Sequence, residues 1–294
     1  MTANHTYLAN QIIVDPQRES YRGLYGEPLA EAIASAVADV PLLANPASNL
    51  LLQWRGVSYA VEFPASLVDH MSAFAGSFIA QQSPHSNILK LADVVLARCT
   101  SALPELTSDA SLARKLHAVV VDLAARIPDV SSADAYVSSA DEWWAEYIKE
   151  HAFRITLWSS LRVGYMAAFN AYETFIAQCV QQVAGVRDLR GGGKPFKDQL
   201  KLHLGESLTQ RCWHAPDIHT VRQVRHSLSH AGGRVTDALR NVRHGVHVHD
   251  DVLQIMPADI RRAYETLARA AIDLITTVGN APGQSGSTVD GSPQ

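Results

Sequence analysis

Long apolar runs are missing from this sequence. No stretch approaches the roughly 18 uncharged apolar residues that a membrane-spanning helix needs. We therefore expect no membrane-spanning segment and no membrane partner. The first residues, Met-Thr-Ala-Asn-His-Thr, also lack the basic region and apolar run of a secretory signal, so we expect a cytoplasmic protein.

Cysteine is also scarce. The 294 residues contain three cysteines, Cys99, Cys179 and Cys212, which are far apart in the sequence and odd in number. This pattern argues against a disulfide framework and against a zinc knuckle, and it fits a reducing compartment. The hydrophobic share of 47% and the charged share of 18% indicate a folded protein with a sizeable core.

Charge is distributed unevenly between the two halves of the chain. Residues 1–150 contain 9 Lys/Arg against 17 Asp/Glu, whereas residues 151–294 contain 16 against 12. The basic excess lies mostly in residues 151–250, with 13 basic and 7 acidic residues. Such an asymmetry suggests different partners for the two halves, and a surface of this kind can attract a polyanion.

The sequence predicts a mainly α-helical protein. In the first half, apolar residues at helical spacing predict helices over residues 28–39, 65–81, 86–101, 110–127 and 132–148. Between Leu51 and Phe63, alternating residues on either side of Arg55-Gly56 suggest a short β-hairpin. We find no catalytic constellation in this half, so its role is not assigned.

The second half is predicted to begin with one long helix from Asp141 to about Val183. The expected elements that follow are a glycine-rich loop over 187–195, helices over 196–204 and 206–213, a helix from Pro216 to Ala231, an extended piece over 252–256, and a helix over 258–278. The loop has three consecutive glycines but lacks the spacing of a phosphate-binding loop. The tail over 279–294 is rich in Gly, Ser and Pro and is predicted to be disordered.

The helix that starts at Pro216 carries the residues with the clearest chemical meaning. With about 100° per residue, its apolar residues form one face and Arg225 lies beside that face. The polar side of the helix holds Arg222, His226, Ser229 and His230. A guanidinium can hold a phosphate, and an imidazole can transfer a proton near neutral pH. Arg225 and His230 could therefore promote attack of a ribose 2′-OH on the adjacent phosphate, with His230 moving the proton and Arg225 stabilising the charge on phosphorus.

Arg225 and His230, separated by four residues on a helix that ends in Ala-Gly-Gly-Arg, resemble the signature motif of the HEPN superfamily. The layout is similar as well, with a long helix that carries Glu173 in the sequence YETFIA ahead of shorter helices, the Arg/His helix and a final helix. His226 departs from the pattern, because the position after the arginine is often Asn or Asp in the family. The expected parts are an acidic, mostly helical region (1–140), a HEPN-like bundle (141–278) and the tail (279–294).

The resemblance implies a metal-independent endoribonuclease of the toxin–antitoxin, abortive-infection or antiviral-defence kind, which needs no cofactor. It implies RNA as the substrate, a homodimer in which two Arg/His motifs face each other, and an antitoxin or inhibitor protein as a further partner. Glu173 would orient Arg225, while Arg222, His226 and Ser229 would complete a polar wall. Additional contacts to phosphate are expected from Arg234, Arg240 and Arg243.

Two other interpretations fit the same residues. Some members of the superfamily are non-catalytic, so the domain could bind nucleic acid, a nucleotide or a protein without cutting RNA. The second interpretation is a metal-dependent hydrolase. His226 and His230 are four residues apart on a helix, and the sequence RHGVHVHDD at 243–251 offers further ligands. Against a metal, no glutamate follows His226 to act as the base.

Overall fold

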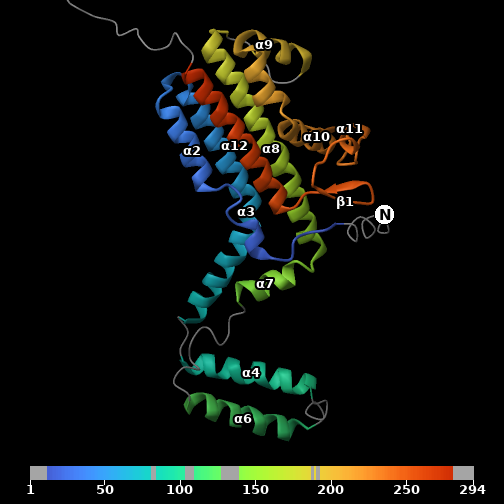
Figure 1. Cartoon of the computed structure of the whole chain (residues 1–294). Helices are drawn as coiled ribbons and strands as arrows, with labels where there is room; N and C mark the ends of the chain where they lie inside the picture. The colour runs from blue at the N-terminus through green and yellow to red at the C-terminus, as the bar shows by residue number, and fades with distance from the viewer. Residues whose placement is uncertain are drawn as a thin grey trace, which may run out of the picture. The chain divides into compact units, whose positions relative to one another are not determined.

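The computed structural model describes residues 12–80, 84–102, 109–126, 139–186, 189 and 193–280. In these residues the chain is mainly α-helical, as predicted (Figure 1). The sheet in this part of the chain consists of two short antiparallel strands, β1 (His247–His249) and β2 (Val252–Gln254). No helix in the described ranges has the length and apolar character needed to cross a membrane.

Helices account for most of the described residues. In chain order they are η1 (Arg18–Tyr21), α2 (Glu27–Ala38), η2 (Pro41–Leu43), α3 (Ala44–Ala80), α4 (Pro84–Ala102), α6 (Ala110–Arg126), α7 (Ala140–Tyr147), α8 (His151–Ala184), α9 (Gly193–Thr209), the π-helix η5 (Gln210–His214), α10 (Pro216–His230), α11 (Asp237–Arg240) and α12 (Pro257–Gly279). The predictions for 127–138, for most of the loop over 187–195 and for the tail from 281 onward lie outside the described residues.

The predicted β-hairpin between Leu51 and Phe63 is wrong, because this segment lies within helix α3. The alternation of apolar and polar residues there also fits a helix. Leu50, Trp54, Ser58 and Val61 are buried, and their spacing of four, four and three residues places them on one helical face. Burial of that face against the rest of the protein therefore decides the structure of the segment.

The chain forms two compact units, which differ from the predicted division at residue 140. One unit comprises the described residues of Met1–Phe63 and Glu150–Gln294, and the other those of Pro64–Lys149. In the second unit, α4 packs against α6, and His117 Nε2 lies 3.1 Å from Asp93 Oδ1. The long helix predicted from residue 141 is interrupted, because α7 ends at Tyr147 and α8 begins at His151.

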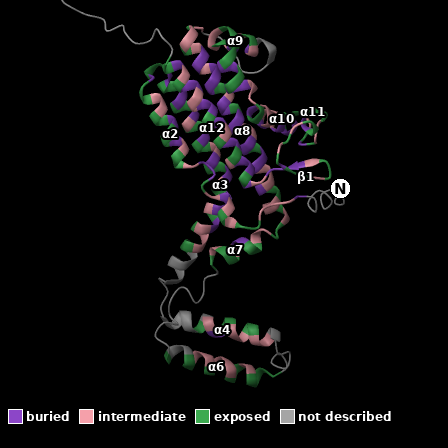
Figure 2. Cartoon of the chain, viewed as in Figure 1, coloured by how far each residue is buried: buried purple, intermediate pink, exposed green. Residues whose placement is uncertain are grey.

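The first unit joins its N-terminal and C-terminal segments through a common core. Helices α8 and α12 lie side by side, and most of their inward-facing residues are buried (Figure 2). The indole of Trp54 donates a 2.9 Å hydrogen bond to the carbonyl oxygen of Ala168, and Ser58 Oγ donates to the Tyr264 hydroxyl at 3.0 Å. These contacts tie α3 to α8 and α12, so residues 12–63 belong to the same core as the C-terminal half.

The start of α10 is fixed by aromatic packing around η5. Trp213 is buried and its ring centroid lies 5.0 Å from that of Phe196 and 6.0 Å from that of Phe169. Tyr172 on α8 donates a hydrogen bond of 2.6 Å to the carbonyl oxygen of Cys212. This packing holds the chain that enters α10 against α8, and it therefore sets the position of the residues that α10 carries.

Candidate Arg/His site on helix α10

Helix α10 begins at Pro216, as predicted, and ends at His230, one residue before the predicted end at Ala231. Its buried residues, Ile218, Val221, Val224 and Leu228, recur every three or four positions and face the core. After His230 the chain turns at Gly232 and Gly233, where the backbone N–H of Gly233 donates to the carbonyl oxygen of Ser227 at 2.9 Å. The helix therefore ends within one turn of His230.

The two glycines that end α10 are expected to differ in their tolerance of alanine. Gly232 has φ +62° with open space around a built Cβ, whereas Gly233 has φ +86° and its Cβ would lie 2.5 Å from the Arg162 guanidinium. Gly232→Ala should lower the free energy of unfolding by about 1 kcal/mol, because only the left-handed backbone is strained. Gly233→Ala should cost about 2–3 kcal/mol, because the Arg162 guanidinium must also shift and lose its hydrogen bond to the Gly232 carbonyl oxygen. Urea unfolding of both variants measures the difference, and equal losses would contradict this account.

Helices α8 and α10 face each other through a row of polar contacts. The Nε of Arg225 donates to Asn170 Oδ1 at 3.0 Å. One turn further along α10, the Ser229 hydroxyl lies 3.4 Å from Met166 Sδ and donates to the carbonyl oxygen of Arg225 at 2.8 Å. Arg225 is half-buried in this row, so the position of its guanidinium is set by the amide on α8.

Glu173 continues the same row on α8. Burial raises the pKa of its carboxyl group, and the positive charges of Arg225 and then Arg222 act in the opposite direction. The predicted role of Glu173 was to orient Arg225. The charges of Glu173 and Arg225 interact, but the hydrogen bond that positions the Arg225 guanidinium is the one that it donates to Asn170.

His226 and His230 lie next to each other on the outer face of α10. Both residues are exposed, and their ring centroids are 4.7 Å apart with an angle of 46° between the planes. Because Arg225 immediately precedes His226, the helix places a guanidinium and two imidazoles on adjoining parts of its surface. These are groups that can hold a phosphate and transfer a proton.

Arg222 lies elsewhere than the periodicity suggested. Its guanidinium lies over the Trp213 ring at 4.9 Å, donates to the carbonyl oxygen of Trp213 at 3.1 Å, and lies 2.9 Å from His219 Nδ1. Burial lowers its pKa, and Glu173 opposes that shift. The long side chain therefore reaches back to the start of α10, so Arg222 does not share an exposed polar wall with His226 and His230.

The three arginines predicted to contact phosphate have different surroundings. Arg240 is held by two carboxylates, at 2.9 Å from Asp237 and 3.0 Å from Asp251. Arg234 is exposed after the end of α10 and Arg243 is exposed on the loop before β1. All three arginines are exposed, but the charge of Arg240 is already compensated by its two carboxylates, so Arg234 and Arg243 are the better candidates to contact phosphate.

The histidines of the sequence RHGVHVHDD are spread over a loop and a strand. His247 and His249 lie on β1, and His244 Nδ1 accepts a hydrogen bond of 3.2 Å from the backbone N–H of Val246. Within the described residues, no group of three or more His, Cys, Asp or Glu side chains is close enough together to hold a metal ion.

Asn170 and Met166 were not found from the sequence. They precede Glu173 by three and seven residues on α8, which places all three on one helical face. That spacing is visible in the sequence, but their contact with α10 depends on how the two helices pack. Sequence periodicity alone does not reveal which pairs of helices meet.

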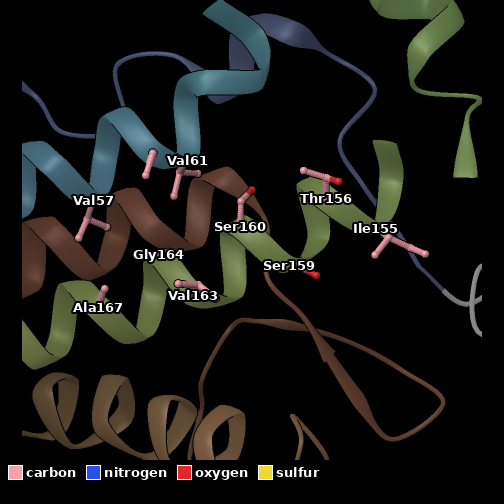
Figure 3. Close-up of a pocket in the computed structure, with 10 residues that line it drawn as sticks. Val57, Val61, Ile155, Thr156, Ser159, Ser160, Val163, Gly164 and Ala167 are labelled. Carbon is pink, nitrogen blue, oxygen red and sulfur yellow. The ribbon is translucent and has the colours of Figure 1, made fainter. Parts of the chain in front are cut away.

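A separate groove lies between α3 and α8 (Figure 3). It has a volume of about 460 Å³ and is lined mainly by small and apolar side chains, including Val57 and Val61 from α3 and Ile155 and Val163 from α8. Among the described residues that line it, the polar groups are the hydroxyls of Thr156, Ser159 and Ser160, and none of these residues is charged. The groove therefore lacks the acid, base and phosphate-binding groups that α10 provides.

Comparison of the chain with protein-family models, with curated proteins and with solved structures finds no match.

Proposed function

We propose that this protein is a metal-independent endoribonuclease whose reaction uses Arg225 and His230. The observation that carries the proposal is the position of Arg225. Asn170 accepts from its Nε, and within the described part of the chain neither terminal nitrogen of this guanidinium makes a hydrogen bond. A guanidinium held at one nitrogen and open at two others suits a phosphate, which binds arginine through paired hydrogen bonds.

The proposed reaction is an internal transfer at the phosphate. The ribose 2′-oxygen attacks phosphorus, its proton passes to His230, and the bond from phosphorus to the 5′-oxygen breaks. His230 then returns a proton to the departing oxygen, so that the products are a 2′,3′-cyclic phosphate and a 5′-hydroxyl. Arg225 stabilises the negative charge that gathers on the non-bridging oxygens. His226, adjacent to His230, would contact the RNA near the same phosphate.

The biological setting follows from the resemblance to the HEPN superfamily. On that basis we propose an all-α bundle that forms a homodimer and acts as a toxin or defence effector, with an antitoxin or inhibitor protein as its partner. A dimer would also help to exclude water from the reaction. His230 is exposed in the single chain, and a second copy would help enclose the phosphate. Light scattering of the purified chain should give twice the mass of 32.0 kDa.

The proposal is tested by incubating the purified full chain with a defined RNA oligonucleotide in the presence of EDTA. We expect cutting that EDTA does not reduce, with 2′,3′-cyclic phosphate ends detected by mass spectrometry. An oligonucleotide with 2′-deoxyribose at the cut position should stay intact, because the attacking hydroxyl is missing. Cutting of the 2′-deoxy substrate, or loss of cutting with EDTA, would contradict the proposed mechanism.

The second candidate is a non-catalytic module that binds RNA, a nucleotide or a protein. It is favoured by the exposure of His226 and His230, since no described residue of a single chain excludes water from them. A gel-shift measurement separates the two functions: binding of RNA by the folded dimer without any cutting would support the module over the enzyme.

Asn170 is expected to act as a positioning residue for Arg225. Asn170→Ala removes the acceptor of the Nε hydrogen bond, so the guanidinium samples other positions and cleavage should slow by about tenfold. Thr174→Ala, one turn further along α8, is the matched control and should leave the rate unchanged. Single-turnover rates of both variants, with melting temperatures as a check on folding, provide the measurement. Equal rates in the two variants would contradict the role of Asn170.

A further inference from the structure

A hollow of about 790 Å³ lies beside the glycines that end α10. It is bounded by α8, by the turn after α10, and by the turn between β1 and β2, and its lining includes Trp158, Arg162, Gly232, Arg234, Asp250 and Val252. These residues are distinct from Arg225 and His230. A volume of this size can hold a ligand with the dimensions of a nucleotide or an aromatic acid.

Arg162 is an unusual charge in the wall of this hollow. It is 9% exposed, its guanidinium lies 4.2 Å above the Trp158 ring, and it donates to the carbonyl oxygen of Gly232 at 2.6 Å. No carboxylate in the described residues forms an ion pair with it, and burial alone accounts for the lowering of its pKa. A buried charge is normally compensated by an opposite one, so Arg162 can accept an anion that the protein itself does not supply.

The rest of the lining adds a second cation and an apolar wall. Arg234 is exposed and makes no ion pair within the described residues, whereas Asp251 is compensated by Arg240 at 3.0 Å. Ile155 and Val252 provide the apolar surface beside Trp158. Asp250 also lies in the lining, and its Oδ2 is 3.7 Å from His249 Nε2.

We propose that this hollow binds a small molecule that carries an anionic group on a flat, largely apolar body. Arg162 would hold the phosphate or carboxylate through the nitrogens that Gly232 does not use, with Arg234 adding a second positive charge. The flat body would lie along Trp158, Ile155 and Val252. The proposed site uses neither Arg225 nor His230 and shares only Arg234 with the expected phosphate contacts, so it does not depend on the proposed ribonuclease activity.

The test uses the full chain without RNA. Adenosine 5′-monophosphate and indole-3-acetate represent a phosphate and a carboxylate on a flat ring, and adenosine and inorganic phosphate represent the ring and the anion alone. Isothermal titration calorimetry should show saturable binding of at least one of the first two probes, and at least about tenfold weaker binding of the separate parts, a difference of about 1.4 kcal/mol.

The variants assign the binding to the hollow. Arg162→Gln should weaken binding at least tenfold and Arg234→Ala several-fold, while Arg269→Ala, which removes an exposed arginine on α12, should bind as the wild type does. Should Arg162→Gln unfold, Ile155→Trp provides a second variant, because it fills the hollow from a position about two turns before Arg162 on α8 and leaves Arg162 in place. It should also abolish binding.

Three outcomes would overturn the proposal. The first is no saturable binding of either ring-bearing anion at millimolar concentration, which would leave Arg162 only the role of holding the Gly232 carbonyl. The second is binding of inorganic phosphate as tight as that of the ring-bearing anions, which would mean that the flat body does not contribute to binding. The third is unchanged binding by both Arg162→Gln and Ile155→Trp, which would place the ligand elsewhere.

Discussion

Replacing Arg225 with alanine is expected to lower the single-turnover rate of RNA cleavage by about 100- to 1000-fold. Removal of one donor that stabilises charge in a transition state typically has an effect of this size. Arg225→Lys keeps the positive charge but loses both the planar pair of donors and the Nε hydrogen bond to Asn170, so its rate should fall by about tenfold. A cleavage rate that falls less in Arg225→Lys than in Arg225→Ala indicates a guanidinium that binds phosphate.

The control for this series is Arg269→Ala. Arg269 is exposed on α12, and its Nε donates to the carbonyl oxygen of Glu265 on the same helix. The Arg269→Ala substitution removes one positive charge from the first unit, as Arg225→Ala does, but it lies outside α10. It should leave the cleavage rate unchanged. If Arg225→Ala and Arg269→Ala cut RNA at the same rate as the wild type, the account of Arg225 fails.

Trp54→Ala is expected to have the largest effect on stability, with a loss of about 3–5 kcal/mol in the free energy of unfolding. Trp54 is fully buried on α3 and its indole donates to the carbonyl oxygen of Ala168. Its ring centroid lies 5.2 Å from that of Tyr264 and 6.2 Å from that of Tyr25, both in edge-to-face arrangements. Alanine would leave a cavity where α3, α8 and α12 meet.

Leu52→Ala is the matched control on the same helix. Leu52 is 71% exposed, so its loss should change the free energy of unfolding by less than about 0.5 kcal/mol. Chemical denaturation of both variants gives the comparison. Similar small losses in both would mean that residues 12–63 are not part of the core that contains α8 and α12, and the division of the chain would have to be revised.

The elements that the sequence predicted best are those with strong local signals. Pro216 at the start of α10 and two glycines after His230 define that helix, and its bounds in the structure agree with the prediction to within one residue. The segment around Arg55-Gly56 failed because its alternation is compatible with both a strand and a helix. Only the burial of Trp54 against α8 and α12 distinguishes the two, and that contact joins residues more than a hundred positions apart.

The candidate site was predictable to a similar extent. Arg225 and His230 could be placed on one helix from spacing alone, and the neighbouring His226 followed. Arg222 was misplaced because a helical wheel gives the direction of a Cβ and not the reach of a long side chain, which here extends to Trp213. Asn170 could not be identified without knowing that α8 packs against α10.

The most direct test of the central claim is the cleavage rate of one RNA, with EDTA present, by the wild type and by His230→Ala purified side by side. Both proteins should have the same mass in solution and the same melting temperature, because His230 is exposed and its ring lies against that of His226, which is exposed as well. The account predicts cleavage by the wild type and at least a 100-fold lower rate for His230→Ala, since the proton-transfer group is lost. Equal rates for the two proteins would contradict it.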